Sequence, residues 1–120
     1  MKKILVVDDE ENIRFLYKEE LGDEGYEVVL ASSGKEALEL LEANKPDLIT
    51  LDIKMPEMDG IETLKKIKEI DKGMPVILCT AYGQYKQDFS SWASDAYVVK
   101  SADLKELKET ISKILEKTAM

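Results

Sequence analysis

Short runs rich in β-branched and other apolar residues alternate with amphipathic stretches along the chain, and this alternation restricts its fold more than any other feature. The predicted strands are Lys3–Asp8, Tyr26–Ala31, Asp47–Asp52, Pro75–Thr80 and Ala96–Val99. Strands that alternate with helical segments form crossover units, which place parallel strands side by side and helices on both faces. We therefore predict an α/β fold with a doubly wound, five-stranded parallel sheet.

The segments between the strands carry apolar residues at helical spacing. These residues are Ile13, Leu16, Tyr17, Leu21, Ala37, Leu38, Leu41, Ile61, Leu64, Ile67, Leu104, Leu107, Ile111, Ile114 and Leu115. Each set forms one stripe of a helix and is expected to pack against the sheet. Capping patterns place Ser33 three residues before Glu36 and Asp103 three residues before Glu106. The segment 82–94 has the least regular pattern and is expected to form a short or mobile fourth helix.

Length, charge and composition narrow the function. A chain of 120 residues fits one compact domain, 1–120, without a separate effector domain. The net charge of -8 disfavours direct binding to nucleic acids. No segment has the length of a membrane span and no signal-peptide pattern is present, so we expect a cytoplasmic protein. Histidine is absent, and the single cysteine, Cys79, is expected to be a buried small hydrophobe, so chemistry must use carboxylates, hydroxyls and lysine.

Acidic residues stand at the ends of two predicted strands. Asp8 and Asp9 end the first strand, and Asp52 ends the third. Since carboxyl ends of parallel strands meet at one edge of a sheet, the three carboxylates are expected to lie together. At about 4 Å and an effective dielectric of about 20, each pair repels by about 4 kcal/mol, which a hard cation would offset. We predict a Mg²⁺ site with Asp9 and Asp52 as direct ligands, Asp8 holding a coordinated water and the Lys54 carbonyl as a further oxygen.

The neighbours of this acid cluster suit phosphoryl transfer to a carboxylate. Asp52 is the predicted nucleophile once a metal has neutralised the cluster. Lys100, after the fifth strand, would offset negative charge on the transferring oxygens. Thr80, at the end of the fourth strand, could donate its hydroxyl to a phosphoryl oxygen and so report the modified state.

These residues, in this order, resemble the response regulator receiver domain of two-component signalling, a CheY-like family. The matching segments are Val6-Val7-Asp8-Asp9-Glu10, residues 47–60, Thr80-Ala81-Tyr82 and residues 95–100. The resemblance implies a flavodoxin-like sheet with strand order 2-1-3-4-5. It also implies that Asp52 accepts a phosphoryl group from a sensor histidine kinase or a histidine phosphotransfer protein, with Asp8 and Asp9 as the acid pair for Mg²⁺.

The same resemblance implies a switch that carries the signal to an unknown downstream protein. Thr80 and Lys100 would sense the phosphoryl group, and Tyr97 would be the switch aromatic. When the Thr80 hydroxyl moves toward the phosphoryl group, the Tyr97 ring can rotate into the vacated space and reshape an interaction surface.

The chain departs from the family pattern after Thr80. Ser101 stands where the family usually has a proline, which leaves open whether the preceding bond is cis, at a cost of about 3–4 kcal/mol, or trans. The segment between Thr80 and the fifth strand is also shorter than usual. We therefore expect a divergent partner surface that exposes Tyr85, Phe89 or Trp92.

Three other functions fit the sequence less well. A small aspartyl-phosphate phosphatase or phosphotransferase would need a second acid soon after its nucleophile, but Ile53-Lys54-Met55 follows Asp52. A nucleotide or flavin binder would need a glycine or hydroxyl cradle after the first strand, where this chain has acids. A structural adaptor without phosphorylation would not need the complete acid, hydroxyl and lysine set.

Overall fold

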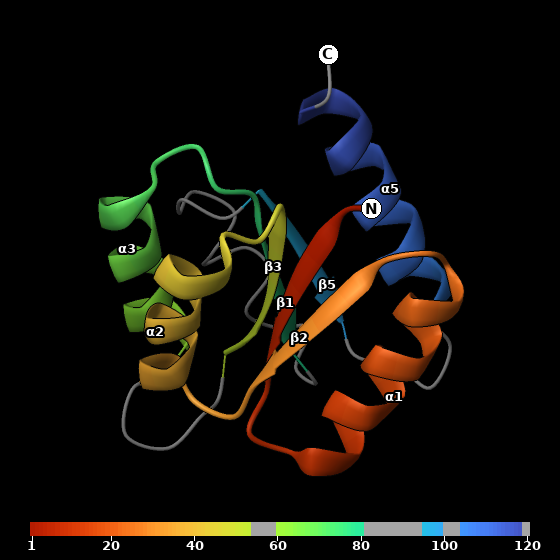
Figure 1. Ribbon diagram of the computed structural model, residues 1–120, viewed down its shortest axis with the longest axis horizontal. Helices are drawn as coiled ribbons and strands as arrows, with labels where there is room; N and C mark the ends of the chain where they lie inside the picture. The colour runs from red at the N-terminus through yellow and green to blue at the C-terminus, as the bar shows by residue number, and fades with distance from the viewer. Residues whose placement is uncertain (54–59, 81–94, 100–103, 119–120) are drawn as a thin grey trace.

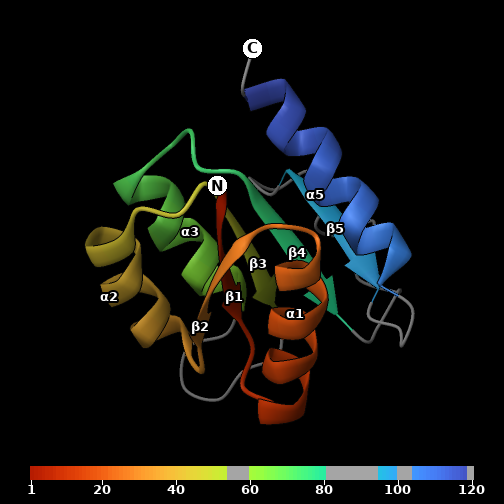
Figure 2. The ribbon, with the colours of Figure 1, turned by 45° about the vertical axis from the view of Figure 1, so that its right-hand side comes forward.

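The computed structural model describes residues 1–53, 60–80, 95–99 and 104–118. The strands are β1 (Lys3–Val7), β2 (Glu27–Ala31), β3 (Leu48–Asp52), β4 (Val76–Thr80) and β5 (Ala96–Val99). All neighbouring strands are parallel, and the sheet lies at the centre of the molecule (Figure 1). The order across the sheet is β2-β1-β3-β4-β5, as the strand labels in Figure 2 show. The predicted fold class and the strand order implied by the resemblance are both confirmed.

Four predicted strands extend one residue too far, because a boundary residue can keep one hydrogen bond without belonging to the paired strand. Asp8 follows β1 but still donates its N–H to Ala31 O at 3.1 Å. Asp47 and Pro75 likewise precede their strands, and each still makes a backbone hydrogen bond to a neighbouring strand. Tyr26 precedes β2, and its N–H instead donates back to α1.

Helices cover both faces of the sheet. The described helices are α1 (Glu11–Asp23), α2 (Gly34–Asn44), α3 (Gly60–Ile70) and α5 (Lys105–Thr118). Figure 2 shows α1 and α5 on one face and α2 and α3 on the other. None of the described helices is both long and apolar enough to cross a membrane. The fourth helix expected in 82–94 lies outside the described residues.

The core consists of two apolar layers, one on each face of the sheet. In β1, Ile4 and Val6 face α1 and α5, whereas Leu5 and Val7 face α2 and α3. Burial on both faces explains why the strands are continuous apolar runs instead of alternating ones. All the apolar stripe residues predicted for the helices are buried or partly buried in one of these layers.

One of the two predicted helix caps is confirmed. Ser33 precedes α2, and its Oγ accepts a hydrogen bond from the Glu36 N–H at 3.1 Å. The Glu36 carboxylate accepts in return from the N–H of Ser32 at 2.7 Å, one residue earlier than in the standard capping box. The second cap, at Asp103, lies outside the described residues.

A carboxylate at the amino edge ties β4, β5 and α3 together. Asp95 Oδ2, just before β5, accepts from the Val76 N–H at 2.8 Å and from Lys68 Nζ at 3.1 Å. Lys68 Nζ also donates to Met74 O at 2.6 Å. These bonds fix the amino ends of β4 and β5, so both strands enter the sheet at a defined register.

Candidate functional site

The predicted acids do meet at the carboxyl edge of the sheet. β1 and β3 are paired with Val7 opposite Leu51, so the next residues, Asp8 and Asp52, stand side by side. Asp8 is 2% exposed and Asp52 is 6% exposed, whereas Asp9 is exposed. Two carboxylates are therefore buried at one edge, and a third lies beside them at the surface.

The loop after β1 brings a further acid into this group. The Glu10 N–H donates to Asp8 Oδ1 at 2.9 Å, which turns the chain directly after the strand. Carboxylate oxygens of Asp8, Asp9 and Glu10 consequently lie within 4.8 Å of one another. Arg14 Nη1 donates to the carbonyl oxygen of Asp8 at 2.8 Å and holds the loop on α1.

This cluster of acids suits a hard cation. Three carboxylates at such distances repel one another, and Mg²⁺ prefers oxygen ligands of this kind. Glu10 was not predicted as a ligand, although it continues the acidic run from Asp8. Asp52 lies outside the close group of three, beside Asp8. The arrangement can therefore hold a cation next to the Asp52 carboxylate.

Gly60, the first residue of α3, lies close to the backbone of Asp52 and Ile53 at the end of β3. Its N–H donates to Ile53 O at 2.7 Å and closes the segment between β3 and α3. A Cβ at this position would lie 2.6 Å from Ile53 Cα and would also clash with Asp52 O. Only glycine fits this close approach, so Gly60 helps to fix the backbone that carries Asp52.

The other predicted site residues are described only in part. Thr80 ends β4, paired with Val99 of β5, so its backbone lies at the same edge as Asp52. Tyr97, in β5 opposite Leu78, is half-buried against the layer under α2 and α3. The predicted residues outside the described part are Lys54, Tyr85, Phe89, Trp92, Lys100 and Ser101.

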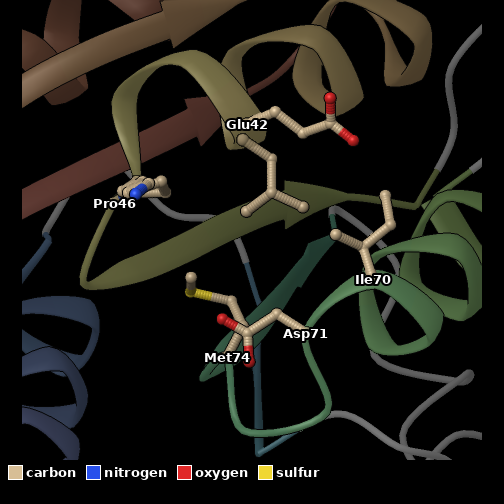
Figure 3. Close-up of a pocket in the computed structure, with 7 residues that line it drawn as sticks. Glu42, Pro46, Ile70, Asp71 and Met74 are labelled. Carbon is tan, nitrogen blue, oxygen red and sulfur yellow. The ribbon is translucent and has the colours of Figure 1, made fainter.

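A cavity of about 420 Å³ lies at the opposite edge, near the amino ends of β3 and β4 (Figure 3). Pro46 and Met74 line it just before these strands, and Ile70 lines it from the end of α3. Ligand crevices in open parallel sheets lie beyond the carboxyl ends of the strands. This cavity is therefore separate from the acid cluster and adds nothing to its chemistry.

The structure is therefore a flavodoxin-like α/β domain with a cluster of acids at the carboxyl edge of its sheet. The family model for the response regulator receiver domain matches residues 4–112, and the chain belongs to this family. It is therefore the receiver domain of a two-component response regulator, a signalling module.

Similar proteins extend over almost the whole chain. Sporulation initiation phosphotransferase F of Bacillus subtilis is 40% identical over 116 residues, covering 95% of this chain and 94% of that protein. Response regulator protein TrrA from Thermotoga maritima, solved with Mg²⁺-BeF, is 52% identical with a TM-score of 0.90, covering 94% of this chain and 98% of that one. TrrA in complex with histidine kinase ThkA gives a TM-score of 0.89 at 52% identity, covering 96% and 99%.

Proposed function

We propose that this receiver domain takes a phosphoryl group onto Asp52 from a phosphohistidine, in a reaction that depends on Mg²⁺. The observation that carries the proposal is the buried Asp52 carboxylate beside the cluster of Asp8, Asp9 and Glu10. The structure of TrrA with Mg²⁺-BeF supports the choice of metal, because that protein is 52% identical to this chain.

In the proposed reaction an Asp52 carboxylate oxygen attacks phosphorus in line with the phosphohistidine nitrogen. The new O–P bond forms as the P–N bond breaks, and the bonding electrons return to the imidazole. Asp9 and Asp52 would hold Mg²⁺ directly, and Asp8 would hold it through a coordinated water. The Lys54 carbonyl would be a further oxygen ligand, and the Glu10 carboxylate lies close to this group. The bound metal would neutralise charge on the carboxylates and on the phosphoryl oxygens.

Two further residues complete the proposed site. The Lys100 ammonium would offset charge on the phosphoryl oxygens, and the Thr80 hydroxyl would donate to one of them. Rotation of the half-buried Tyr97 ring would then change the surface offered to a downstream protein. Thr80 and Tyr97 lie on the neighbouring strands β4 and β5, which supports a mechanical link between them.

We propose a sensor histidine kinase or a histidine phosphotransfer protein as the donor. The complex of TrrA with histidine kinase ThkA supports a kinase as the donor. The match to Sporulation initiation phosphotransferase F, a protein named for phosphoryl transfer, supports phosphoryl transfer between this domain and another protein.

Acetyl phosphate with magnesium chloride tests the site without a kinase. We expect the parent protein to gain one phosphoryl group by mass spectrometry and Asp52→Asn to gain none, because an amide cannot serve as the nucleophile. The control, Asp71→Asn, changes an acid near the opposite edge and should be phosphorylated like the parent. Chelation of the metal should stop the reaction. Phosphorylation of Asp52→Asn at the parent's rate would overturn the assignment of Asp52.

A further inference from the structure

Arg14 carries a positive charge near the end of α1 that disfavours one. It is the fourth residue of that helix, beside the amino end, where the helix dipole opposes a cation. Among the described residues Arg14 makes no ion pair that would offset this cost. Its guanidinium instead donates to a backbone carbonyl, that of Asp8, at 2.8 Å. Hydrogen bonds from charged groups are about twice as strong as neutral ones, so this contact accounts for the place of Arg14.

The Asp8 carbonyl belongs to the peptide that joins the buried Asp8 to the exposed Asp9. Two other bonds already fix Asp8, since its N–H donates to Ala31 O at 3.1 Å and its Oδ1 accepts from the Glu10 N–H at 2.9 Å. The Arg14 bond adds the orientation of the peptide plane. Because the peptide unit is planar, that orientation determines where the Asp9 Cα lies.

We propose that Arg14 is a positioning residue for the magnesium site, because its bond holds the Asp8–Asp9 peptide so that the Asp9 carboxylate reaches the cation. Such a restraint matters here, because the carboxylates of Asp8, Asp9 and Glu10, within 4.8 Å of one another, repel and would otherwise move apart. Groups that orient metal ligands typically change metal affinity by about 10- to 100-fold when they are lost. The inference rests on the proposed function, because it assumes that Mg²⁺ binds beside Asp52 with Asp9 as a direct ligand.

The charge of Arg14 alone offers a second explanation of its place. In that case the guanidinium would offset the repulsion among the acids without positioning any of them. The two explanations predict opposite effects on magnesium binding. A positive charge near the acids repels Mg²⁺, so removing charge alone would strengthen magnesium binding, whereas loss of a positioning bond would weaken it. The sign of the change therefore distinguishes them.

The test is the dissociation constant for magnesium chloride, measured by isothermal titration calorimetry on the unphosphorylated protein. Arg14→Met keeps the apolar stem and removes the guanidinium. We expect it to bind magnesium about tenfold more weakly, at the lower end of the range because the lost charge acts in the opposite sense. Arg14→Lys keeps the charge and one flexible donor and should lie between Arg14→Met and the parent. In the Asp9→Asn background, which lacks the carboxylate that is positioned, Arg14→Met should weaken binding by less than about threefold.

The matched control is Lys18→Met, which removes the same charge from an exposed side chain about one turn further along α1. It should bind magnesium as the parent does. Unchanged or tighter binding by Arg14→Met would overturn the positioning role, even if that variant is less stable in urea. The full loss of affinity in the Asp9→Asn background would overturn the route through Asp9.

Phosphorylation of the same samples by acetyl phosphate keeps the two proposals apart. If the parent is phosphorylated at Asp52 and Arg14→Met binds magnesium as the parent does, only the positioning role fails. If the parent binds magnesium but is not phosphorylated at Asp52, the proposed function fails, and the binding constants still decide the role of Arg14. A parent that binds no magnesium would overturn both.

Discussion

Gly60 shows how one missing side chain can position a reactive group. The chain returns at Gly60 so close to the backbone of Asp52 and Ile53 that a methyl group has no space. We expect Gly60→Ala to lower the free energy of unfolding by about 1–3 kcal/mol, because the added carbon must push the β3 end aside. Urea unfolding measures this change.

The matched control is Gly22→Ala, near the end of α1, where an added Cβ meets nothing within 4 Å. This variant should be as stable as the parent or more stable by up to about 1 kcal/mol, because alanine has the higher helix propensity. Equal losses in the two variants would contradict the role given to the close approach at Gly60.

The buried phenol of Tyr17 predicts a loss of stability in alkali. Its pKa is raised by burial above the ordinary value of 10.0. Above about pH 10 the unfolded chain releases the phenol proton while the folded protein keeps it, so the free energy of unfolding falls as pH rises. The slope contributed by this one group approaches about 1.4 kcal/mol per pH unit.

Urea unfolding from about pH 9 to about pH 11, on the parent and on Tyr17→Phe, measures this slope. We expect the parent to lose stability more steeply above about pH 10 than the variant. Tyr26, whose pKa is also raised by burial, is present in both proteins and cancels in the comparison. Parallel curves would show that the Tyr17 phenol is not protected in the folded state.

At the scale of residues, the sequence predicts the position of a side chain where that position follows from its place on a strand. Asp8 and Asp52 were predicted to meet because each ends a parallel strand, and the pairing of β1 with β3 brings them together. Glu10 was missed because its place depends on the turn made by its own N–H to Asp8. Helical spacing identified Tyr17 as a core residue but could not reveal that it packs in the same layer as Cys79 of β4.

At the scale of elements, the Asp95 side chain joins the start of β4 to α3. Asp95→Ala should lower the free energy of unfolding by about 2 kcal/mol, mainly because the buried Val76 N–H loses its acceptor. Asp95→Asn keeps an acceptor oxygen and loses only the ion pair with Lys68, so its effect should be smaller. Urea unfolding of both variants measures the difference.

The matched control for Asp95 is Glu27→Gln, which removes one partner of an ion pair at the same edge. The Glu27 carboxylate is 3.4 Å from Lys3 Nζ and is 54% exposed. Its loss should change the free energy of unfolding by no more than about 0.5 kcal/mol, since water screens exposed pairs. A larger loss for Asp95→Asn than for Asp95→Ala would refute the hydrogen-bond argument.

The elements themselves were largely predictable because two signals agree. Apolar periodicity located every described strand and helix, and capping chemistry at Ser33 located the start of α2. Some strands were predicted one residue too long. Residues such as Asp8 and Asp47 make only a single backbone hydrogen bond to the neighbouring strand, and an apolar pattern cannot distinguish them from residues inside the strand. The clamp at Asp95 was not predicted, because it joins residues distant in the sequence.

At the scale of the whole molecule, folding concentrates acidic charge at the carboxyl edge of the sheet, where the repulsion between carboxylates destabilises the folded state. The chain carries a net charge of -8. In the folded state the carboxylates of Asp8, Asp9 and Glu10 also lie close together. In the unfolded chain these carboxylates can move apart, so their repulsion destabilises the folded state. A cation bound there would oppose this repulsion and shift the balance toward folding.

Asp9→Asn should therefore change stability in opposite directions with and without the metal. In a chelator we expect the variant to be more stable than the parent by up to about 1 kcal/mol, a limit set by solvent screening of this exposed carboxylate. In magnesium chloride at about 100 times the dissociation constant, the parent should gain about 2.7 kcal/mol and the variant less, because it has lost a ligand.

Urea unfolding in the two conditions measures both differences. Asp23→Asn, at the exposed end of α1 away from the cluster, is the control and should shift stability equally in both. If the same one of the two proteins, parent or Asp9→Asn, has the higher free energy of unfolding both with and without magnesium, Asp9 does not belong to the metal site. If magnesium stabilises neither protein, the acidic cluster does not bind the cation, and the charge at this edge needs another explanation.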